Sequence, residues 1–212
     1  MKKLLADLLF LTLLACASAL ADAPTTTVMV YMCASDMYDA AIEDLLEMCE
    51  AELGDHVQLA ILAGGTSDWE DILEGDALNR FSIEDQDMAD DYEALSMASM
   101  GEPETLVDFL DWAVDTHPAD RYALILWDHG GGTGSGICWD ESANDDFLSV
   151  WEIYDALYTY EDAHPDFHLD LIGFDACLMG TYELAAHLRD LADFMVASEE
   201  LEPGTGWGYT SW

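Results

Sequence analysis

Basic residues are nearly absent from this chain. Its 212 residues include only 5 Lys and Arg against 45 Asp and Glu, which gives a formal net charge of −40 at pH 7. Such a surface repels phosphate backbones and anionic membranes, so we expect neither nucleic acid nor anionic lipid as a partner. Cationic peptides or metal ions suit it better, although an acidic coat that only maintains solubility has the same composition.

Long apolar runs are also missing, except at the N-terminus. Residues 1–3 carry two Lys, residues 4–14 are apolar except for Asp7 and Thr12, and residues 19–21 have the small-x-small pattern of a cleavage site. This order predicts that residues 1–21 are a signal for export from a bacterial cell. Residues 13–16 also match a lipoprotein box, so secretion and a lipid anchor on Cys16 are both open. No later run approaches the ~20 apolar residues of a membrane span.

Cysteine is scarce, and no C-x-x-C is present. Four thiols remain beyond Cys16, at positions 33, 49, 138 and 177. An exported protein permits a disulfide among Cys33, Cys49 and Cys138, but ordinary buried thiols fit the same pattern. The sequence leaves both readings open.

What the chain does contain is an alternation of apolar runs and amphipathic segments. We predict strands at 26–33, 57–62, 122–127, 169–175 and 194–197, and helices at 35–54, 103–118, 148–160 and directly after residue 176. Ser35 and Asp36 are expected to cap the first helix. We interpret residues 69–83 as a hairpin or a small side sheet, 84–91 as an acidic loop and 137–139 as a short strand. The β-α-β order predicts an α/β fold with a mostly parallel sheet flanked by helices.

The last residues contain a glycine-rich loop at 203–207 with no predicted element behind it. We therefore expect this chain to be incomplete at its C-terminus and to be part of a longer protein.

Two of the predicted strands are followed at once by reactive side chains. Strand 122–127 precedes Asp128, His129 and three glycines, and strand 169–175 precedes Ala176 and Cys177. The carboxyl ends of parallel strands are where open α/β sheets collect ligands. A thiol and an imidazole brought together there are the two parts of a cysteine nucleophile. Each alone has a plainer explanation, as an inert buried thiol or a surface histidine.

The surroundings of both residues support the pairing. A helix that begins near Cys177 would favour a thiolate at its amino end. The glycines after His129 would let backbone amides approach a substrate and hold an oxyanion. Asp128 is a candidate to orient His129, although neighbouring strand residues point apart.

In combination, these motifs resemble the clostripain family of cysteine peptidases, which has a caspase-like fold shared with gingipains and legumains. The matching segments are residues 28–33 with the turn at 35–36, 42–45, 127–131, 175–179 and 197–200. The resemblance implies a caspase-like three-layer sandwich over residues 25–212.

The same resemblance implies roles for individual residues. His129 would be the general acid and base, Cys177 the nucleophile, and the backbone amides of Gly130 and Cys177 the oxyanion hole. Asp175 would bind an Arg, or less well a Lys, on the acyl side of the scissile bond. An alternative for Asp175 is the N-cap of the helix that follows. The implied partners are peptides or proteins with basic residues, and no cofactor is implied.

Two departures from the family pattern bear on these roles. No Lys or Arg occurs between residues 130 and 176, so self-cleavage at a basic site in that linker is excluded. No acid occurs in residues 204–212 that could add a second charge to the pocket for a basic side chain. Calcium, which some relatives require, could use Asp87, Asp90, Asp91 and Glu93, but a solvated loop explains the same run.

Two other functions remain open from the sequence. The chain could be a non-catalytic binding module on the cell surface with the same fold. It could also be a thiol amidase or acyltransferase that uses the same Cys–His dyad.

Overall fold

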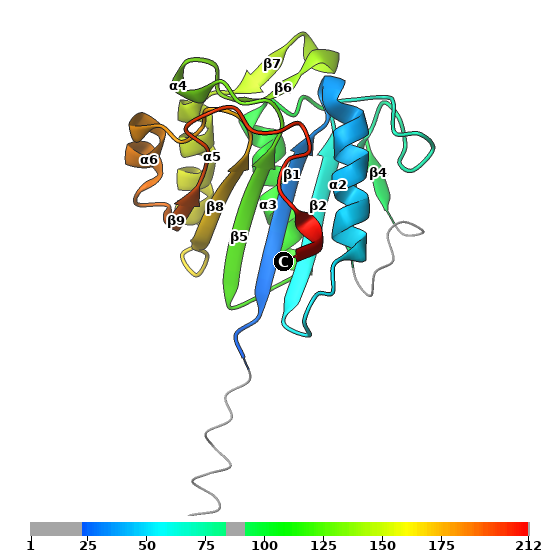
Figure 1. Cartoon of the computed structure of the whole chain (residues 1–212). Coiled ribbons are helices and arrows are strands. Elements are labelled where there is room, and N and C mark those ends of the chain that lie inside the picture. The colour runs from blue at the N-terminus through cyan, green and yellow to red at the C-terminus, as the bar shows by residue number, and fades with distance from the viewer. Residues whose placement is uncertain (1–22, 84–91, 212) are drawn as a thin grey trace, which may run out of the picture.

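The structure is a computed structural model, and it describes residues 23–83 and 92–211. Its centre is a seven-stranded sheet with the strand order β4-β3-β2-β1-β5-β8-β9 (Figure 1). β1 (Thr26–Cys33), β2 (Val57–Gly64), β5 (Arg121–Trp127), β8 (Leu169–Asp175) and β9 (Ala192–Val196) are parallel. The predicted mostly parallel sheet is confirmed.

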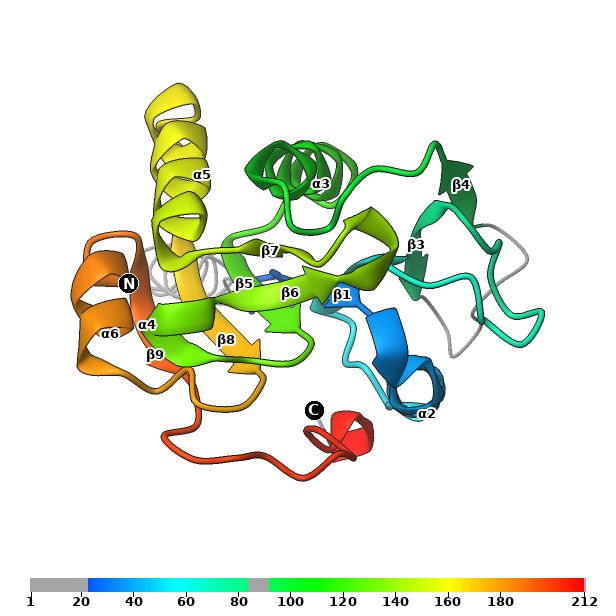
Figure 2. The ribbon, with the colours of Figure 1, turned by 90° about the horizontal axis from the view of Figure 1, so that it is seen from above.

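Helices cover the sheet on both faces. α3 (Pro103–Thr116) and α5 (Val150–Ala163) pack on one face, and α2 (Tyr38–Glu50) with the short helix η3 (Tyr209–Ser211) on the other (Figure 2). β1 alternates between the two layers, since Met29, Tyr31 and Cys33 join the core beneath α3 and α5 while Val30 and Met32 join the core beneath α2. Burial on both faces explains why this strand is apolar throughout.

One edge of the sheet differs from the prediction. β3 (Leu78–Ile83) pairs antiparallel with β2, and β4 (Glu93–Leu95) pairs antiparallel with β3. The expectation of a hairpin or separate side sheet at 69–83 was therefore wrong. The predicted acidic loop at 84–91 lies outside the described residues, as does the predicted signal at 1–21.

The connection between β5 and α5 contains more structure than expected. The glycine-rich segment forms α4 (Gly132–Ser135), and β6 (Ile137–Asp140) pairs with β7 (Asp146–Leu148) after the turn η2 (Glu141–Ala143). α5 then begins with a capping box, in which Ser149 and Glu152 bond reciprocally. These elements lie above the carboxyl ends of the parallel strands (Figure 1).

The helix after β8 begins later than predicted. α6 (Tyr182–Leu188) is capped by Thr181, whose side chain accepts a hydrogen bond from the Leu184 N–H. Residues 176–180 form a loop, so Cys177 does not lie at a helix amino end and Asp175 is not the N-cap. Both expectations were wrong.

None of the cysteines in the described part of the chain, Cys33, Cys49, Cys138 and Cys177, is bonded to another in a disulfide. Cys177 is partly exposed, while the other three are buried. The disulfide considered among them does not form. In the same described ranges, no helix combines the length and the apolar character that crossing a bilayer requires.

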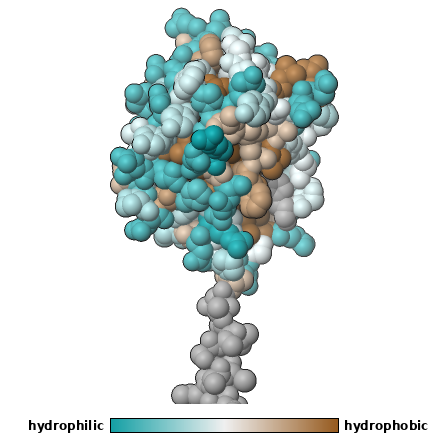
Figure 3. Space-filling model, turned by 90° about the vertical axis from the view of Figure 1, so that its left-hand side faces the viewer, coloured by the Kyte–Doolittle hydropathy of each residue, from teal (hydrophilic) through white to brown (hydrophobic). Residues whose placement is uncertain are grey.

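β9 forms the opposite edge of the sheet. Figure 3 shows this side of the molecule as a mostly hydrophilic surface with apolar area gathered near its middle. The side chains of Phe194 and Val196 on β9 are 69% and 45% exposed.

Candidate active site

The candidate site lies where β5 and β8 end side by side. Trp127 is the register partner of Asp175, and each is the last residue of its strand. His129 and Cys177 each follow two residues later. The two segments thus leave the same edge of the sheet on adjacent strands, as their place after two buried runs predicted (Figure 2).

A cavity of about 150 Å³ opens between these two segments. His129, Asp175 and Cys177 all line it. The rest of its lining comes from the turn before α2, the strand ends and the segment before η3: Met37, Trp127, Asp128, Ala176, Glu202, Pro203, Gly204 and Gly206. A thiol, an imidazole and a carboxylate therefore share one small space.

Gly130 brings the two segments into contact. A Cβ atom at this position would overlap the carbonyl oxygen of Cys177 and crowd the side chains of Ala176 and Met179. Only glycine allows the backbone after β5 to approach the backbone after β8 this closely. Gly130 thus sets the spacing between the segments that carry the imidazole and the thiol.

The Cys177 sulfur is held in a loop rather than at a helix end. Its Sγ accepts a hydrogen bond of 3.3 Å from the backbone N–H of Glu202. The loop is fixed by two long-range backbone bonds, from the Leu178 N–H to the Glu200 carbonyl at 3.0 Å and from the Gly180 N–H to the Ser198 carbonyl at 2.6 Å. An N–H donor aimed at sulfur stabilises negative charge there.

The His129 imidazole contacts Asp36, an acid predicted to cap a helix. Its Nε2 lies 2.9 Å from Oδ1 of Asp36, and both side chains are about half exposed. Asp36 belongs to the turn η1 (Ser35–Met37) after β1. Neither Ser35 nor Asp36 caps α2, whose N-cap is Met37 without a side-chain cap. The predicted capping role was wrong.

Asp128 does not orient His129 either. It is 2% exposed and its Oδ2 accepts a 2.5 Å hydrogen bond from the Trp139 N–H. Burial raises the pKa of Asp128 well above its ordinary value, against hydrogen bonds from the backbone of His129 and Trp139. Its side chain therefore anchors the backbone of β6 rather than the His129 ring.

Asp175 lies buried at the base of the cavity and is held by the C-terminal segment. Its Oδ2 accepts hydrogen bonds from the Tyr209 hydroxyl at 2.6 Å and the Trp207 N–H at 3.1 Å. These bonds fix one oxygen of the carboxylate. The residue therefore has a defined orientation, which suits a specificity-determining group.

Two further acids approach Asp175. A Cβ atom built on Gly206 would lie 2.9 Å from the carboxylates of both Asp44 and Asp175, which places these two acids on one side of that glycine. Burial, with a smaller contribution from its hydrogen bond to Asp175, raises the pKa of Glu202. Second carboxyl groups therefore lie near Asp175, on α2 and at residue 202, although residues 204–212 contain none.

Asp44 is the more deeply buried of the two. It is 2% exposed, and its Oδ2 accepts a 2.7 Å hydrogen bond from the indole Nε1 of Trp127. Burial raises the pKa of Asp44 to about 7, against this hydrogen bond. One sequence signal could have found it, because an acid among Ala41, Leu45 and Met48 interrupts the buried stripe of the helix.

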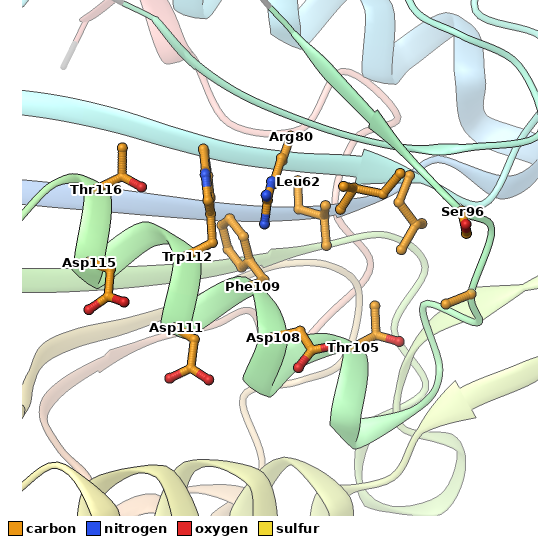
Figure 4. Close-up of a pocket in the computed structure, with 13 residues that line it drawn as sticks. Leu62, Arg80, Ser96, Thr105, Asp108, Phe109, Asp111, Trp112, Asp115 and Thr116 are labelled. Carbon is orange, nitrogen blue, oxygen red and sulfur yellow. The ribbon is translucent and has the colours of Figure 1, made fainter.

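A larger cavity of about 610 Å³ lies elsewhere, between α3 and the β3–β4 edge. Figure 4 shows Trp112 and Phe109 of α3 lying beside Arg80 there, with acids along the same helix. No cysteine or histidine is among its described lining residues. Reactive groups gather in the smaller cavity, not here.

Metal ligands do not gather at either place. Within residues 23–83 and 92–211, no group of three or more His, Cys, Asp or Glu side chains is arranged to hold a metal ion. Of the calcium candidates, Asp87, Asp90 and Asp91 lie outside the described residues. Glu93 pairs with Arg80 at 2.6 Å.

The fold and the site together define a caspase-like α/β protein with a thiol and an imidazole at adjacent strand ends. The sequence model that describes the clostripain family, peptidase family C11, matches residues 30–212 of this chain. The chain belongs to the clostripain family.

Individual relatives agree with this assignment. Clostripain of Hathewaya histolytica is 38% identical over 130 residues, which is 53% of this chain and 24% of that protein. A secreted C11 cysteine protease from Bacteroides thetaiotaomicron, solved with an irreversible peptide inhibitor, is 24% identical and superposes with a TM-score of 0.72. The match covers 88% of this chain and 52% of that protein. An inactive zymogen C11 protease from Parabacteroides distasonis is also 24% identical, with a TM-score of 0.65 over 90% of this chain and 53% of that protein. These two structures confirm the fold, and the chain spans about half of their length.

Proposed function

We propose that this chain carries the catalytic dyad of an exported cysteine endopeptidase that cleaves peptide bonds after Arg, and less well after Lys. The observation that carries the proposal is the shared cavity, since Cys177, His129 and Asp175 line the same 150 Å³ space. Membership of the clostripain family supports the same activity. The substrates are peptides or proteins with basic residues.

The proposed reaction needs only the thiol, the imidazole and water. The Cys177 thiolate attacks the scissile carbonyl carbon, an S–C bond forms, and the carbonyl π electrons move to oxygen. The backbone amides of Gly130 and Cys177 hold this oxyanion. Protonated His129 donates its proton to the leaving amine as the C–N bond breaks, which leaves an acyl-enzyme.

Deacylation reverses the roles. Neutral His129 takes a proton from water while the water oxygen attacks the acyl carbon. The S–C bond then breaks and the carboxylic acid leaves, so that Cys177 returns as thiolate and His129 as imidazolium. The Glu202 N–H, 3.3 Å from Sγ, supports the thiolate at the start and end of the cycle.

The proposed preference for Arg rests on the acids at the base of the cavity. Asp175 is buried at the base of the cavity and oriented, and a carboxylate pairs better with a planar guanidinium than with the point charge of Lys. Burial, and to a smaller extent the hydrogen bond and charge of Asp175, raise the pKa of Glu202. A guanidinium bound there would favour the ionised form of both acids.

Export is part of the proposal as well. The apolar and small-x-small pattern of residues 1–21 supports it, as does the description of the Bacteroides relative as secreted. Release and anchoring through a lipid on Cys16 remain the two outcomes. Mass spectrometry of the mature N-terminus separates them.

The direct test is the Cys177→Ala variant with a fluorogenic Arg-amide peptide. We expect hydrolysis to disappear, because no other thiol lines the cavity among the described residues. Cys49→Ala is the matched control, since it removes a buried thiol on α2 and should retain activity. Hydrolysis that survives in Cys177→Ala would refute the proposed nucleophile.

Two further measurements separate the alternatives. A peptidyl-arginine electrophile labels Cys177 alone in an active peptidase and labels nothing in a binding module that lacks a working site. Product analysis with added amine acceptors distinguishes hydrolysis from acyl transfer, because an acyltransferase would give the new amide in place of the free acid.

A further inference from the structure

Asp36 and His129 meet because they leave adjacent strands at the same edge. β1 and β5 are neighbours with Met32 opposite Trp127. Asp36 lies four residues beyond Met32, and His129 two residues beyond Trp127. The resulting contact, 2.9 Å between Oδ1 and Nε2, joins residues 93 positions apart.

The turn that carries Asp36 is fixed by its own bonds. The Ala34 N–H donates to the Gly64 carbonyl at 2.9 Å, and the Met37 N–H donates to the Ala34 carbonyl at 2.6 Å. Ser35, buried and with a φ of 40°, accepts a 3.2 Å hydrogen bond from the Glu141 N–H through its Oγ. A turn tied to β2 and η2 in this way presents Asp36 in a defined place.

The imidazole stands between two cavities. His129 lines both the 150 Å³ cavity with Cys177 and a neighbouring cavity of about 460 Å³. Asp36 lines only the second, and Cys177 only the first. When Nε2 donates its proton to Asp36, the remaining nitrogen, Nδ1, is the one left to exchange a proton on the Cys177 side.

We propose that Asp36 is a positioning residue, which holds the His129 ring and its tautomer for proton transfer by accepting the Nε2–H. This inference rests on the proposed peptidase function. A stabilising role for the fold is a poor alternative, because ion pairs between half-exposed side chains contribute little to stability. The effect of Asp36 should therefore fall on the reaction rate.

The test compares Asp36→Ala, Asp36→Asn and the control Asp39→Asn in the full chain with an Arg-amide peptide. Asp39 is an exposed acid in the first turn of α2, three residues further along. We expect kcat to fall about fivefold to tenfold in Asp36→Ala, with KM unchanged, because proton transfer depends on ring orientation. Asp36→Asn keeps an acceptor oxygen and should retain more activity.

Rescue by the conservative variant is the readout that a merely structural role would not give, because Asp36→Asn keeps an acceptor for the Nε2–H of His129 without keeping the charge. Asp39→Asn should leave kcat unchanged. Wild-type kcat in Asp36→Ala, equal losses in Asp36→Ala and Asp36→Asn, or a change in KM alone, would overturn the inference.

A second measurement remains informative if the chain hydrolyses no peptide. Nitrogen-15 NMR of the His129 ring in Cys177→Ala protein reports which nitrogen carries the proton. We expect the Nε2–H form with Asp36 present and a mixture of tautomers in the Asp36→Ala background. The same mixture in both proteins would reject the role of Asp36, whereas absent hydrolysis with a clean Nε2–H form would reject the peptidase proposal alone.

Discussion

Asp44 is a carboxylate buried at the point where the sheet, α2 and the C-terminal segment meet. Burial raises its pKa from 3.8 to about 7, so the folded protein favours its neutral form. Below pH 4 Asp44 is neutral in both the folded and the unfolded protein, so it costs no stability. As the pH rises from 4 to 7 the free energy of unfolding falls, because Asp44 ionises more readily in the unfolded chain than in its buried place. The free energy of unfolding should therefore carry a pH-dependent contribution from this single residue.

Replacing Asp44 with Asn tests the direction of this pH dependence of stability. Asn keeps an acceptor for the Trp127 indole N–H but cannot ionise. Relative to wild type, Asp44→Asn should gain stability between pH 4 and pH 8, by up to about 4 kcal/mol if the whole shift is expressed. Urea unfolding at both pH values measures the difference. An equal difference between the two proteins at pH 4 and pH 8 would show that Asp44 is not strained by ionisation.

Some residues of the site could be recognised from the sequence, and others only from the structure. Asp175 ends a buried strand, and His129 and Cys177 each come two residues after one, so their place at one sheet edge could be inferred from the sequence. Asp36, Asp44 and Glu202 could not be assigned in the same way. Asp36 reads as a helix cap and Asp44 as one more acid in an acidic chain. Only the packing of β1, α2 and residues 202–209 brings Asp36 to His129, Asp44 to Trp127 and Glu202 into the lining of the cavity.

Among the elements, the segment after β5 depends most on one glycine. A Cβ at Gly130 would meet the backbone of Cys177, which cannot move aside as a flexible side chain could. We expect Gly130→Ala to separate the two segments, to lower the free energy of unfolding by about 1–3 kcal/mol and to abolish most of the proposed activity.

Gly134→Ala is the matched control for this change. It lies four residues further along in α4, and a Cβ there meets nothing within 4 Å. Urea unfolding and hydrolysis of the Arg-amide peptide should both be near wild type for Gly134→Ala. Equal behaviour of the two variants would show that the close approach at Gly130 does not matter.

The parallel strands were predictable because both of their faces are buried, which leaves continuous apolar runs in the sequence. The start of α6 was harder to place. The run from Tyr182 to Leu191 has helical spacing, and only Gly180 and Thr181, a breaker and an N-cap candidate, mark its beginning. Backbone bonds from Leu178 and Gly180 to residues 198–200 hold that stretch as a loop. Their partners lie some 20 residues away, so local pattern could not reveal them.

At the scale of the whole molecule, the C-terminal segment ties the site to the sheet. Trp207 lies against Gly173 of β8, where an added Cβ would be 2.8 Å from the indole ring, and Tyr209 is fully buried beside α2. The Tyr209 N–H donates to Glu47 at 2.8 Å while its hydroxyl reaches Asp175. Residues far apart in sequence thus depend on one another for the shape of the cavity.

The net charge of −40 acts on the same molecule as a whole. Arg80, Arg121 and Arg189 each pair with an acid, but these pairs are few against 45 Asp and Glu. Repulsion among acids therefore outweighs attraction between opposite charges, and it weakens the compact state. Added salt screens both, so the net effect should favour folding.

Raising NaCl from 0.01 M to 0.15 M shortens the screening length from about 30 Å to about 8 Å. At pH 8 we expect the melting temperature to rise by several degrees, whereas a protein stabilised by surface ion pairs would lose stability. The rise should shrink as the pH is lowered toward the sequence pI of about 4.1, because protonation removes the repulsion. Calorimetry at both salt concentrations and at each pH measures the melting temperature. A melting temperature that falls with salt at pH 8 would mean that the few arginine pairs outweigh the repulsion of the acids, contrary to the charge balance of the chain.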